Sequence, residues 1–223
     1  MSLKSVVTFD CYRTLVDFDL NGATLPIVRD RLDEVGVSHE EFLDNLRVMR
    51  FQGVVQPYRR YREIVRDTLE NCMLLHGIEF REEDYEQLMA AAERFPAFPE
   101  VPEALRRLKE RYEIAIITNS DDDLIPYHLE AIGVPFDYVV TAQQAGAYKP
   151  RPAAFEELFS VLPQTRDQII HVAQGWEYDI MPTKSMGVGR RVWVNRYGRK
   201  GSAFYAPYDE IRDLSELPPL LGM

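Results

Sequence analysis

The sequence predicts an α/β fold in which helices alternate with the strands of a parallel sheet. Three observations support this prediction. Short runs of Ile, Val and Phe recur between amphipathic stretches. Polar residues such as Asp10, Asn119 and Asp179 follow these runs. One long segment, residues 15–97, contains only helix-like patterns. Strands that alternate with helical stretches of this length indicate parallel pairing through crossover helices.

The first strand is expected at residues 5–10, where Val6, Val7 and Phe9 form a nearly continuous apolar run. Such a run is typical of a strand buried on both faces of a parallel sheet. Helices follow it, because Gly36 can end one helix and Ser38, with Glu41 three residues on, fits a capping box that opens the next. The helical stretches expected in this segment are residues 25–35, 40–50, 58–76 and 84–94.

The remainder of the chain alternates between the two kinds of element. Helices are expected at residues 102–111, 122–132, 152–161 and 179–186, and strands at 113–118, 138–141, 168–173 and 190–194, with a short strand or turn near 208–214. The sequence therefore predicts a Rossmann-like parallel sheet core with crossover helices and an inserted helical cap domain. The core is expected to be discontinuous, formed by residues 1–14 and 98–223, with the cap at 15–97.

Composition restricts the partners. The chain has 223 residues, of which 46% are hydrophobic, which suits one core with a small accessory domain. The net charge is -10 and no basic run stands out, so we expect no nucleic acid and no membrane as partner. Cys11 and Cys72 make no disulfide framework, and no secretory pattern or apolar run of about 18 residues is present. We expect a cytoplasmic protein, and the sequence leaves monomer and homodimer open.

Three charged residues are candidates for the chemistry. Asp10 lies at the carboxyl end of a buried strand, where open α/β sheets bind ligands and where a carboxylate can act as a nucleophile. Lys149 precedes Pro150 and is therefore expected in extended backbone, where its charge would favour the ionised form of Asp10. Asp179 either caps a helix or holds Lys149 and helps to orient a water molecule.

Polar neighbours complete the catalytic candidates. Thr14 is expected to donate a hydrogen bond within the turn or simply to close it. Thr118 and Asn119 offer donors for developing negative charge or for the substrate, the alternative for Asn119 being an Asx-turn. His171 lies in a predicted strand, and we expect it to be packed there rather than catalytic.

The order Asp, Thr/Asn, Lys, Asp resembles the four motifs of the haloacid dehalogenase superfamily over essentially the whole chain. Phosphatases of that superfamily carry an acid two residues after the nucleophile and hold Mg²⁺ with carboxylates of motifs one and four, whereas this chain has Tyr12 and Gln174. The phrase Phe-Asp-Cys-Tyr-Arg-Thr-Leu at residues 9–15 and Val-Trp-Val-Asn-Arg at 192–196 instead resemble the type II, 2-haloacid dehalogenase branch.

The resemblance implies a hydrolase that acts on a carbon–halide bond. Asp10 would attack C2 of a small 2-haloalkanoate, halide would leave, and water would hydrolyse the ester. No cofactor would be required, and Mg²⁺ would be needed only if the chain were a phosphatase. The alternatives are a small-molecule phosphatase, a ring hydrolase of the azetidine-carboxylate type and a non-catalytic relative that binds a ligand in the crevice.

Six residues are candidates for binding a small anionic substrate. Arg13 stands where the branch carries Gly, so it either reaches the substrate or points outward. The resemblance also implies an Arg from an early cap helix, for which Arg47 is the first choice. The full set of substrate-binding candidates is Tyr12, Arg13, Arg47, Arg50, Gln174 and Trp176.

Overall fold

The computed structural model describes residues 5–223, and its centre is a six-stranded sheet in which each neighbouring pair is parallel. The strand order is β3-β2-β1-β4-β5-β6. β1 lies inside the sheet, and its apolar side chains are fully buried. This agrees with the continuous apolar run and confirms the predicted α/β class. The strands are β1 Val6–Phe9, β2 Glu113–Thr118, β3 Tyr138–Thr141, β4 Ile169–Ala173, β5 Arg190–Val194 and β6 Asp209–Ile211.

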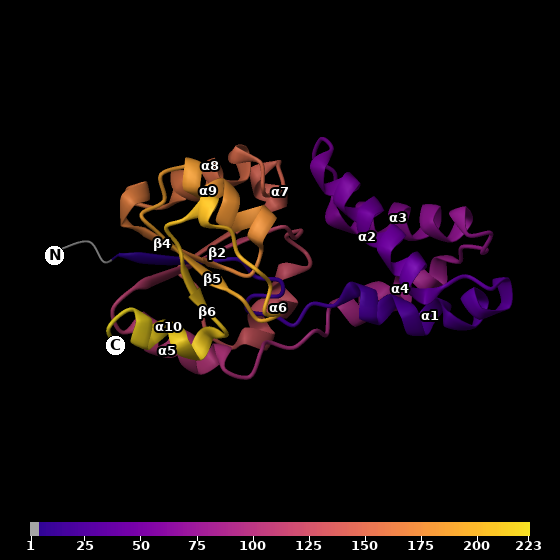
Figure 1. Ribbon diagram of the computed structural model, residues 1–223, viewed down its shortest axis with the longest axis horizontal. Helices are drawn as coiled ribbons and strands as arrows, with labels where there is room; N and C mark the ends of the chain where they lie inside the picture. Colours follow the sequence, from indigo (N-terminus) through magenta and orange to yellow (C-terminus); the bar gives the residue numbers. More distant parts are fainter. Residues whose placement is uncertain (1–4) are drawn as a thin grey trace. The chain divides into compact units, whose positions relative to one another are not determined.

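Helices cover both faces of this sheet. Figure 1 shows α7, α8 and α9 on one side, and α5 and α10 on the other. The predicted Rossmann-like arrangement of a parallel sheet with crossover helices is thereby confirmed. Within residues 5–223, no helix combines the length and apolarity needed to cross a membrane. The helices of this part are α5 Val101–Lys109, α6 Ile125–Ile132, α7 Ala142–Ala145, α8 Pro152–Val161, α9 Met181–Ser185 and α10 Leu217–Leu220.

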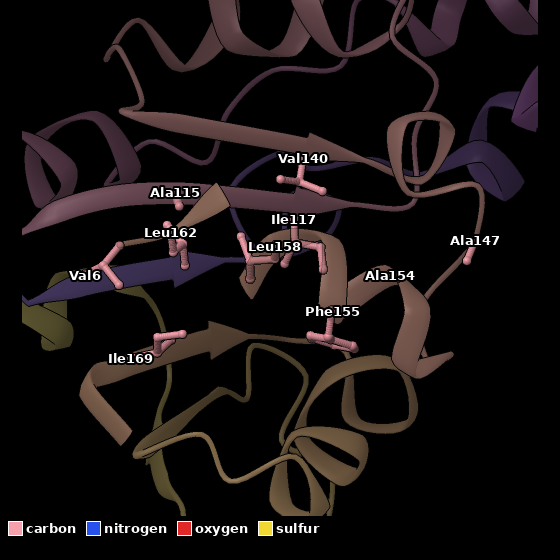
Figure 2. Packing of buried hydrophobic residues seen from close by; sticks show 10 residues of the cluster. All are labelled: Val6, Ala115, Ile117, Val140, Ala147, Ala154, Phe155, Leu158, Leu162 and Ile169. Atoms are coloured by element: carbon pink, nitrogen blue, oxygen red, sulfur yellow. The ribbon is translucent and has the colours of Figure 1, made fainter. Parts of the chain in front are cut away.

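One apolar cluster fixes α8 on the sheet. Its side chains come from α8 and from β1, β2, β3 and β4, as Figure 2 shows. Ala154, Phe155 and Leu158 follow the i, i+1, i+4 spacing of one helix face, and each is at most 2% exposed. Because Val6 and Ile117 meet that face, burial of apolar area holds β1 and β2 in place beneath the helix.

Two predicted helices differ from those in the structure. The helix expected at 179–186 is divided into a π-helical turn, η2 at Trp176–Ile180, followed by α9. The helix expected from 122 begins only at Ile125, because the amides of Leu124 and Ile125 both donate to the Asp121 carbonyl in a turn. Such single π-turns are associated with functional sites, where they change the direction of a side chain.

The inserted segment forms a separate compact unit, Phe18–Phe95, while the described residues up to Asp17 join Pro96–Met223 in the other. The sequence placed these limits at 15 and 97. Residues at the junction explain the difference, since Asp17 donates its amide to the Pro96 carbonyl at 2.9 Å and Val16 forms an antiparallel bridge with Ala97. The two connecting segments therefore run side by side within the sheet-containing unit.

The helical unit contains α1 Leu20–Val35, α2 His39–Val55, α3 Tyr61–Leu75 and α4 Glu82–Ala92. Gly36 ends α1 in the left-handed region at φ 72°, and the Ser38 side chain accepts the Glu41 amide at the start of α2, as the sequence suggested. Inside the unit, Arg31 pairs with Asp84 through two bonds of 2.7 and 2.8 Å. This pair joins α1 to α4.

We predict that the Arg31–Asp84 pair behaves as a buried ion pair. Arg31→Met leaves the Asp84 carboxylate, whose side chain is 7% exposed, without its cation, and should lower the free energy of unfolding by about 3 kcal/mol. The double variant Arg31→Met/Asp84→Leu should recover most of the loss, because no buried charge remains. Urea unfolding measures both. Equal stability of Arg31→Met and the wild-type protein would contradict the prediction.

Candidate active site

The site is built on the carboxyl ends of adjacent parallel strands. β1 pairs with β2 and β4 in a register that sets Phe9 beside Ile116 and Val172, so the residues after each strand meet at one edge. Asp10 directly follows β1, its amide donates to the Val172 carbonyl at 3.1 Å, and the residue is 8% exposed. The backbone therefore fixes this carboxylate at the sheet edge.

Lys149 holds two carboxylates with one ammonium group. Its Nζ lies 2.8 Å from Asp10 Oδ1, 2.8 Å from Asp179 Oδ1 and 3.0 Å from the Ile117 carbonyl. An ammonium group has three donors, so all are used, and the side chain is 1% exposed. The structure thus brings Asp10, Lys149 and Asp179 together.

Thr14 fixes the second oxygen of the nucleophile candidate. Its hydroxyl donates to Asp10 Oδ2 at 2.6 Å and accepts the Gln174 amide at 2.8 Å, which sets the direction of the hydroxyl hydrogen. The Thr14 carbonyl accepts from Arg196 Nη2 at 2.8 Å, and the same nitrogen pairs with Glu100. Arg196 was not among the candidate site residues, because a contact between positions 14 and 196 has no local signal in the sequence.

Asn119 positions Lys149 through its backbone. The Asn119 amide group donates to the Lys149 carbonyl at 3.0 Å, and its oxygen accepts the Lys149 amide at 2.8 Å. The Asx-turn alternative is therefore replaced by a long-range contact with the lysine segment. Thr118 is 1% exposed, and its hydroxyl has no hydrogen-bond partner among residues 5–223. Its hydroxyl is available as a donor at the end of β2.

His171 joins the site through Asp179. Its Nε2 lies 3.1 Å from Asp179 Oδ1, and its Nδ1 lies 2.8 Å from the Thr8 hydroxyl. The packing expected for His171 also occurs, since its ring contacts Phe155 edge-on. The register of β1 and β4 places Thr8 opposite His171. The contact could be predicted only with the strand register, which the sequence alone does not give.

Burial and charge shift the pKa values of these groups in different directions. Burial raises the pKa of Asp10, with Lys149 opposing and the Asp179 charge adding to the rise. Burial acts in the same sense on Asp179, but Lys149 and His171 outweigh it and lower the pKa. Burial would lower the pKa of Lys149, yet the two carboxylates raise it. Lys149 therefore stays charged, and Asp179 holds its charge more firmly than Asp10.

Cys11, the neighbour of Asp10, does not compete as a nucleophile. It is fully buried and carries a free thiol. Burial, with the Asp10 charge adding to it, raises the pKa of the thiol well above its usual value. Because the thiolate is the reactive form of cysteine, the carboxylate of Asp10 is the available nucleophile at this edge.

Tyr12 turns its hydroxyl toward two buried polar groups. The oxygen lies 2.6 Å from Ser120 Oγ and 3.2 Å from His128 Nδ1, and the ring packs edge-on against the imidazole. Its position is therefore fixed by the segment after β2. The expectation that Tyr12 lines the substrate pocket stays a prediction.

Arg13 adopts a backbone conformation that favours glycine. Its φ is 65°, in the left-handed region, which accounts for the Gly that the family pattern has there. The guanidinium lies 4.7 Å from the centre of the Tyr197 ring and pairs with Asp17 at 3.2 Å. Substrate binding by Arg13 stays a prediction, and the observed contacts give the side chain another role.

Trp176 anchors the π-turn that carries Asp179. Its ring packs on Trp193, Tyr205 and Tyr208, with centroid distances of 4.7, 5.9 and 5.2 Å. The backbone carbonyl of Gln174 accepts from Trp193 Nε1 at 3.1 Å. Direct substrate contacts of the Gln174 and Trp176 side chains are untested. Their observed contacts hold the turn against β5 and the segment after it.

The two arginines proposed in the helical unit differ in environment. The Arg47 side chain is 66% exposed and lies 3.6 Å from Asp44 on the same helix. Arg50 donates from Nη2 to Asn21, and its Nη1 is buried with no partner among the described residues. A buried donor without a partner is costly, so Arg50 is the better candidate for binding an anion. The family resemblance had made Arg47 the first choice.

The donor set at the sheet edge does not fit a divalent cation. Asp10 and Asp179 each direct Oδ1 to Lys149, so the ammonium occupies the position between the carboxylates. Tyr12 stands where a further acid would be needed. Residues 5–223 contain no group of three or more His, Cys, Asp or Glu with the spacing of a metal site. Mg²⁺ requires several hard oxygen ligands, which these residues do not offer it.

Known proteins with a similar sequence or fold are dehalogenases and related hydrolases. A family model described as haloacid dehalogenase-like hydrolase matches residues 4–187. The (S)-2-haloacid dehalogenase 4A of Burkholderia cepacia is 27% identical over 99% of this chain and 96% of that protein. A dehalogenase crystal structure is 26% identical, with a TM-score of 0.80 over 100% of this chain and 98% of that one.

A second solved structure shares the fold. The L-2-haloacid dehalogenase from Xanthobacter autotrophicus, solved with chloropropionic acid covalently bound, is 17% identical with a TM-score of 0.80 over 99% of both chains. At this identity the likeness concerns the architecture alone.

We predict that the left-handed backbone at Arg13 costs stability. Arg13→Gly and Arg13→Ala both remove the guanidinium, so a comparison of the two isolates the backbone. The Gly variant should unfold with a free energy about 1 kcal/mol higher than the Ala variant, because only glycine adopts φ 65° without strain. Urea unfolding provides the measurement. An Ala variant as stable as the Gly variant would contradict the assignment.

Proposed function

The chain belongs to the haloacid dehalogenase-like hydrolases, and we propose that it displaces halide from C2 of a small 2-haloalkanoate through an ester on Asp10. The observation that carries the proposal is the buried ammonium of Lys149 between Asp10 and Asp179. It keeps a nucleophilic carboxylate ionised and occupies the place of a metal ion. The full-length likeness to an (S)-2-haloacid dehalogenase supports the same substrate class.

In the first step, a carboxylate oxygen of Asp10 forms a bond to C2 while the carbon–halogen bond breaks. The electron pair leaves with the halide, so no proton is needed at the leaving group. Lys149 and Thr14 hold the carboxylate in one orientation, which lowers the entropic cost of reaching the reacting carbon. Desolvation strengthens the nucleophile, because Asp10 is 8% exposed.

In the second step, the oxygen of a water molecule attacks the carbonyl carbon of the Asp10 ester. The acyl–oxygen bond breaks, and the 2-hydroxy acid leaves with an oxygen that belonged to Asp10. Asp179 accepts one proton of the water and passes it to the departing alkoxide. The Asp10 carboxyl that forms loses the remaining proton to solvent, which restores the carboxylate. The ammonium of Lys149 stabilises the charge that develops on the acyl oxygen, since it remains bonded to Asp10 Oδ1.

Binding of the substrate carboxylate requires donors outside the Lys149 cluster. The hydroxyl of Thr118 is buried without a partner in the described part of the chain and is our candidate at the sheet edge. Arg47 and Arg50 stay predictions for the helical unit, with Arg50 now preferred. Arg50→Met should then raise KM more than Arg47→Met does, and the exposed Arg47 provides the matched control.

The test of the proposed function is halide release. The wild-type protein should release chloride from 2-chloropropionate at an equal rate with and without EDTA. Asp10→Asn should reduce the rate by about four orders of magnitude, each worth about 1.4 kcal/mol, because an amide is a poor nucleophile. Circular dichroism checks that the variant is folded. Phosphate release that needs Mg²⁺ and is lost on chelation would instead assign the chain to the phosphatases.

The pKa shifts predict how pH governs ester formation. Only ionised Asp10 attacks, and its raised pKa places the acidic limb of the rate above the usual range of an aspartate. Lys149 lowers that pKa, so Lys149→Met should move the limb to higher pH as well as slow the reaction. Asp179 raises it, so Asp179→Asn should move the limb to lower pH. Rates of chloride release in the first turnover, measured across the acidic range, test this. Shifts in the same direction for both variants would contradict the charge arrangement.

A further inference from the structure

We propose that His171 is a positioning residue that holds Asp179 Oδ1, so that Asp179 Oδ2 is the oxygen left to accept from the water molecule of ester hydrolysis. This inference rests on the proposed function and adds a residue to it. The imidazole does not reach the substrate in this account. It acts through Asp179, by fixing which of the two carboxylate oxygens faces the hydrolytic water.

The contacts of His171 are specific and buried. The side chain is 1% exposed, with Nδ1 at 2.8 Å from the Thr8 hydroxyl and Nε2 at 3.1 Å from Asp179 Oδ1. Thr8 and His171 face each other in the register of β1 and β4, so the sheet itself sets the position of the ring. An edge-on contact with Phe155 packs the ring.

These contacts place a hydrogen on Nε2 of the His171 ring. Asp179 is ionised, because Lys149 and His171 outweigh burial and lower its pKa, and an ionised carboxylate only accepts hydrogen bonds. His171 Nε2 must therefore carry a hydrogen. The Thr8 hydroxyl faces the other ring nitrogen, Nδ1, at 2.8 Å. Lys149 and Asp179 are the charged groups that face the Nε2 end of the ring, and Asp10 shares the same ammonium.

The two oxygens of Asp179 have opposite environments. Oδ1 accepts from both Lys149 and His171, whereas Oδ2 is buried with no hydrogen-bond partner among residues 5–223. A buried carboxylate oxygen without a partner is costly, and water is the partner that the hydrolytic step supplies. Rotation of the carboxylate would exchange the two oxygens. Two donors on one oxygen oppose that rotation.

Gly175 supplies independent support. A Cβ at this position would lie 2.3 Å from Asp179 Oδ2, closer than any real contact. The backbone does not require glycine, since φ is -64° and ψ is 98°. The absence of a side chain is therefore explained by the close approach of the Asp179 carboxylate to the Gly175 backbone. Any larger residue would push that carboxylate out of the orientation that His171 and Lys149 hold.

The experiment separates ester formation from ester hydrolysis. Protein is mixed with 2-chloropropionate, quenched at intervals and examined by intact-protein mass spectrometry for the ester on Asp10. His171→Leu should slow hydrolysis by about 10–100-fold while ester formation changes by less than about threefold, so the ester accumulates. His171→Gln, whose amide can donate near the same place, should recover part of the hydrolysis rate. Gly175→Ala should accumulate ester as well.

Thr183→Val is the matched control for a disturbed structure. It removes a buried bond of 2.6 Å to the backbone carbonyl of Asp179 and leaves the carboxylate contacts intact. It should lower Tm without ester accumulation. The inference is overturned if His171→Leu hydrolyses ester at the wild-type rate, if both steps slow equally, or if Thr183→Val accumulates as much ester. Chloride release with no ester in any variant would instead overturn the proposed covalent function, and this inference with it.

Discussion

The buried ammonium of Lys149 is the interaction on which the rest of the site depends. An isolated charge at 1% exposure would be prohibitively costly, and here two carboxylates and a carbonyl satisfy every donor. The same charge draws Asp10 and Asp179 toward one point, so the proposed nucleophile and the proposed base lie together. It also gives them a fixed cation that belongs to the protein. Removing Lys149 would leave two buried carboxylates without their shared cation.

The fold supplies this arrangement from distant parts of the chain. Parallel strands deliver Asp10 and the Ile117 carbonyl to one edge, and a π-turn after β4 delivers Asp179. The Asn119 side chain forms two hydrogen bonds with the backbone of Lys149 and so fixes the position from which the lysine side chain extends toward the carboxylates. Each of these supports lies in the sheet-containing unit. The groups to which we assign ester formation and hydrolysis therefore all lie in that unit.

Apolar runs allowed the α/β class and the strand limits to be predicted from the sequence, and the family resemblance indicated the set of motif residues. Asp10, for example, follows a run of buried residues, which is a local signal. Contacts that depend on strand register were not predictable in this way. His171 was expected to pack, because nothing local indicates that Thr8 lies opposite it. The contact between Arg196 and the Thr14 carbonyl was not predictable either, because the two residues are far apart in the sequence. The sequence pattern also predicted a regular helix from residue 179. The structure has a π-turn there instead, because tertiary packing around Trp176, which has no local signal, sets this backbone.

The central claim is that Asp10 forms a covalent ester, and the origin of the product oxygen tests it most directly. With protein in excess over 2-chloropropionate in ¹⁸O-labelled water, the first turnover should give a 2-hydroxy acid whose new oxygen is unlabelled, because it came from Asp10. The label should then appear in the peptide that contains Asp10. Labelled oxygen in the product of the first turnover, with an unlabelled peptide, would show direct attack by water and contradict the account.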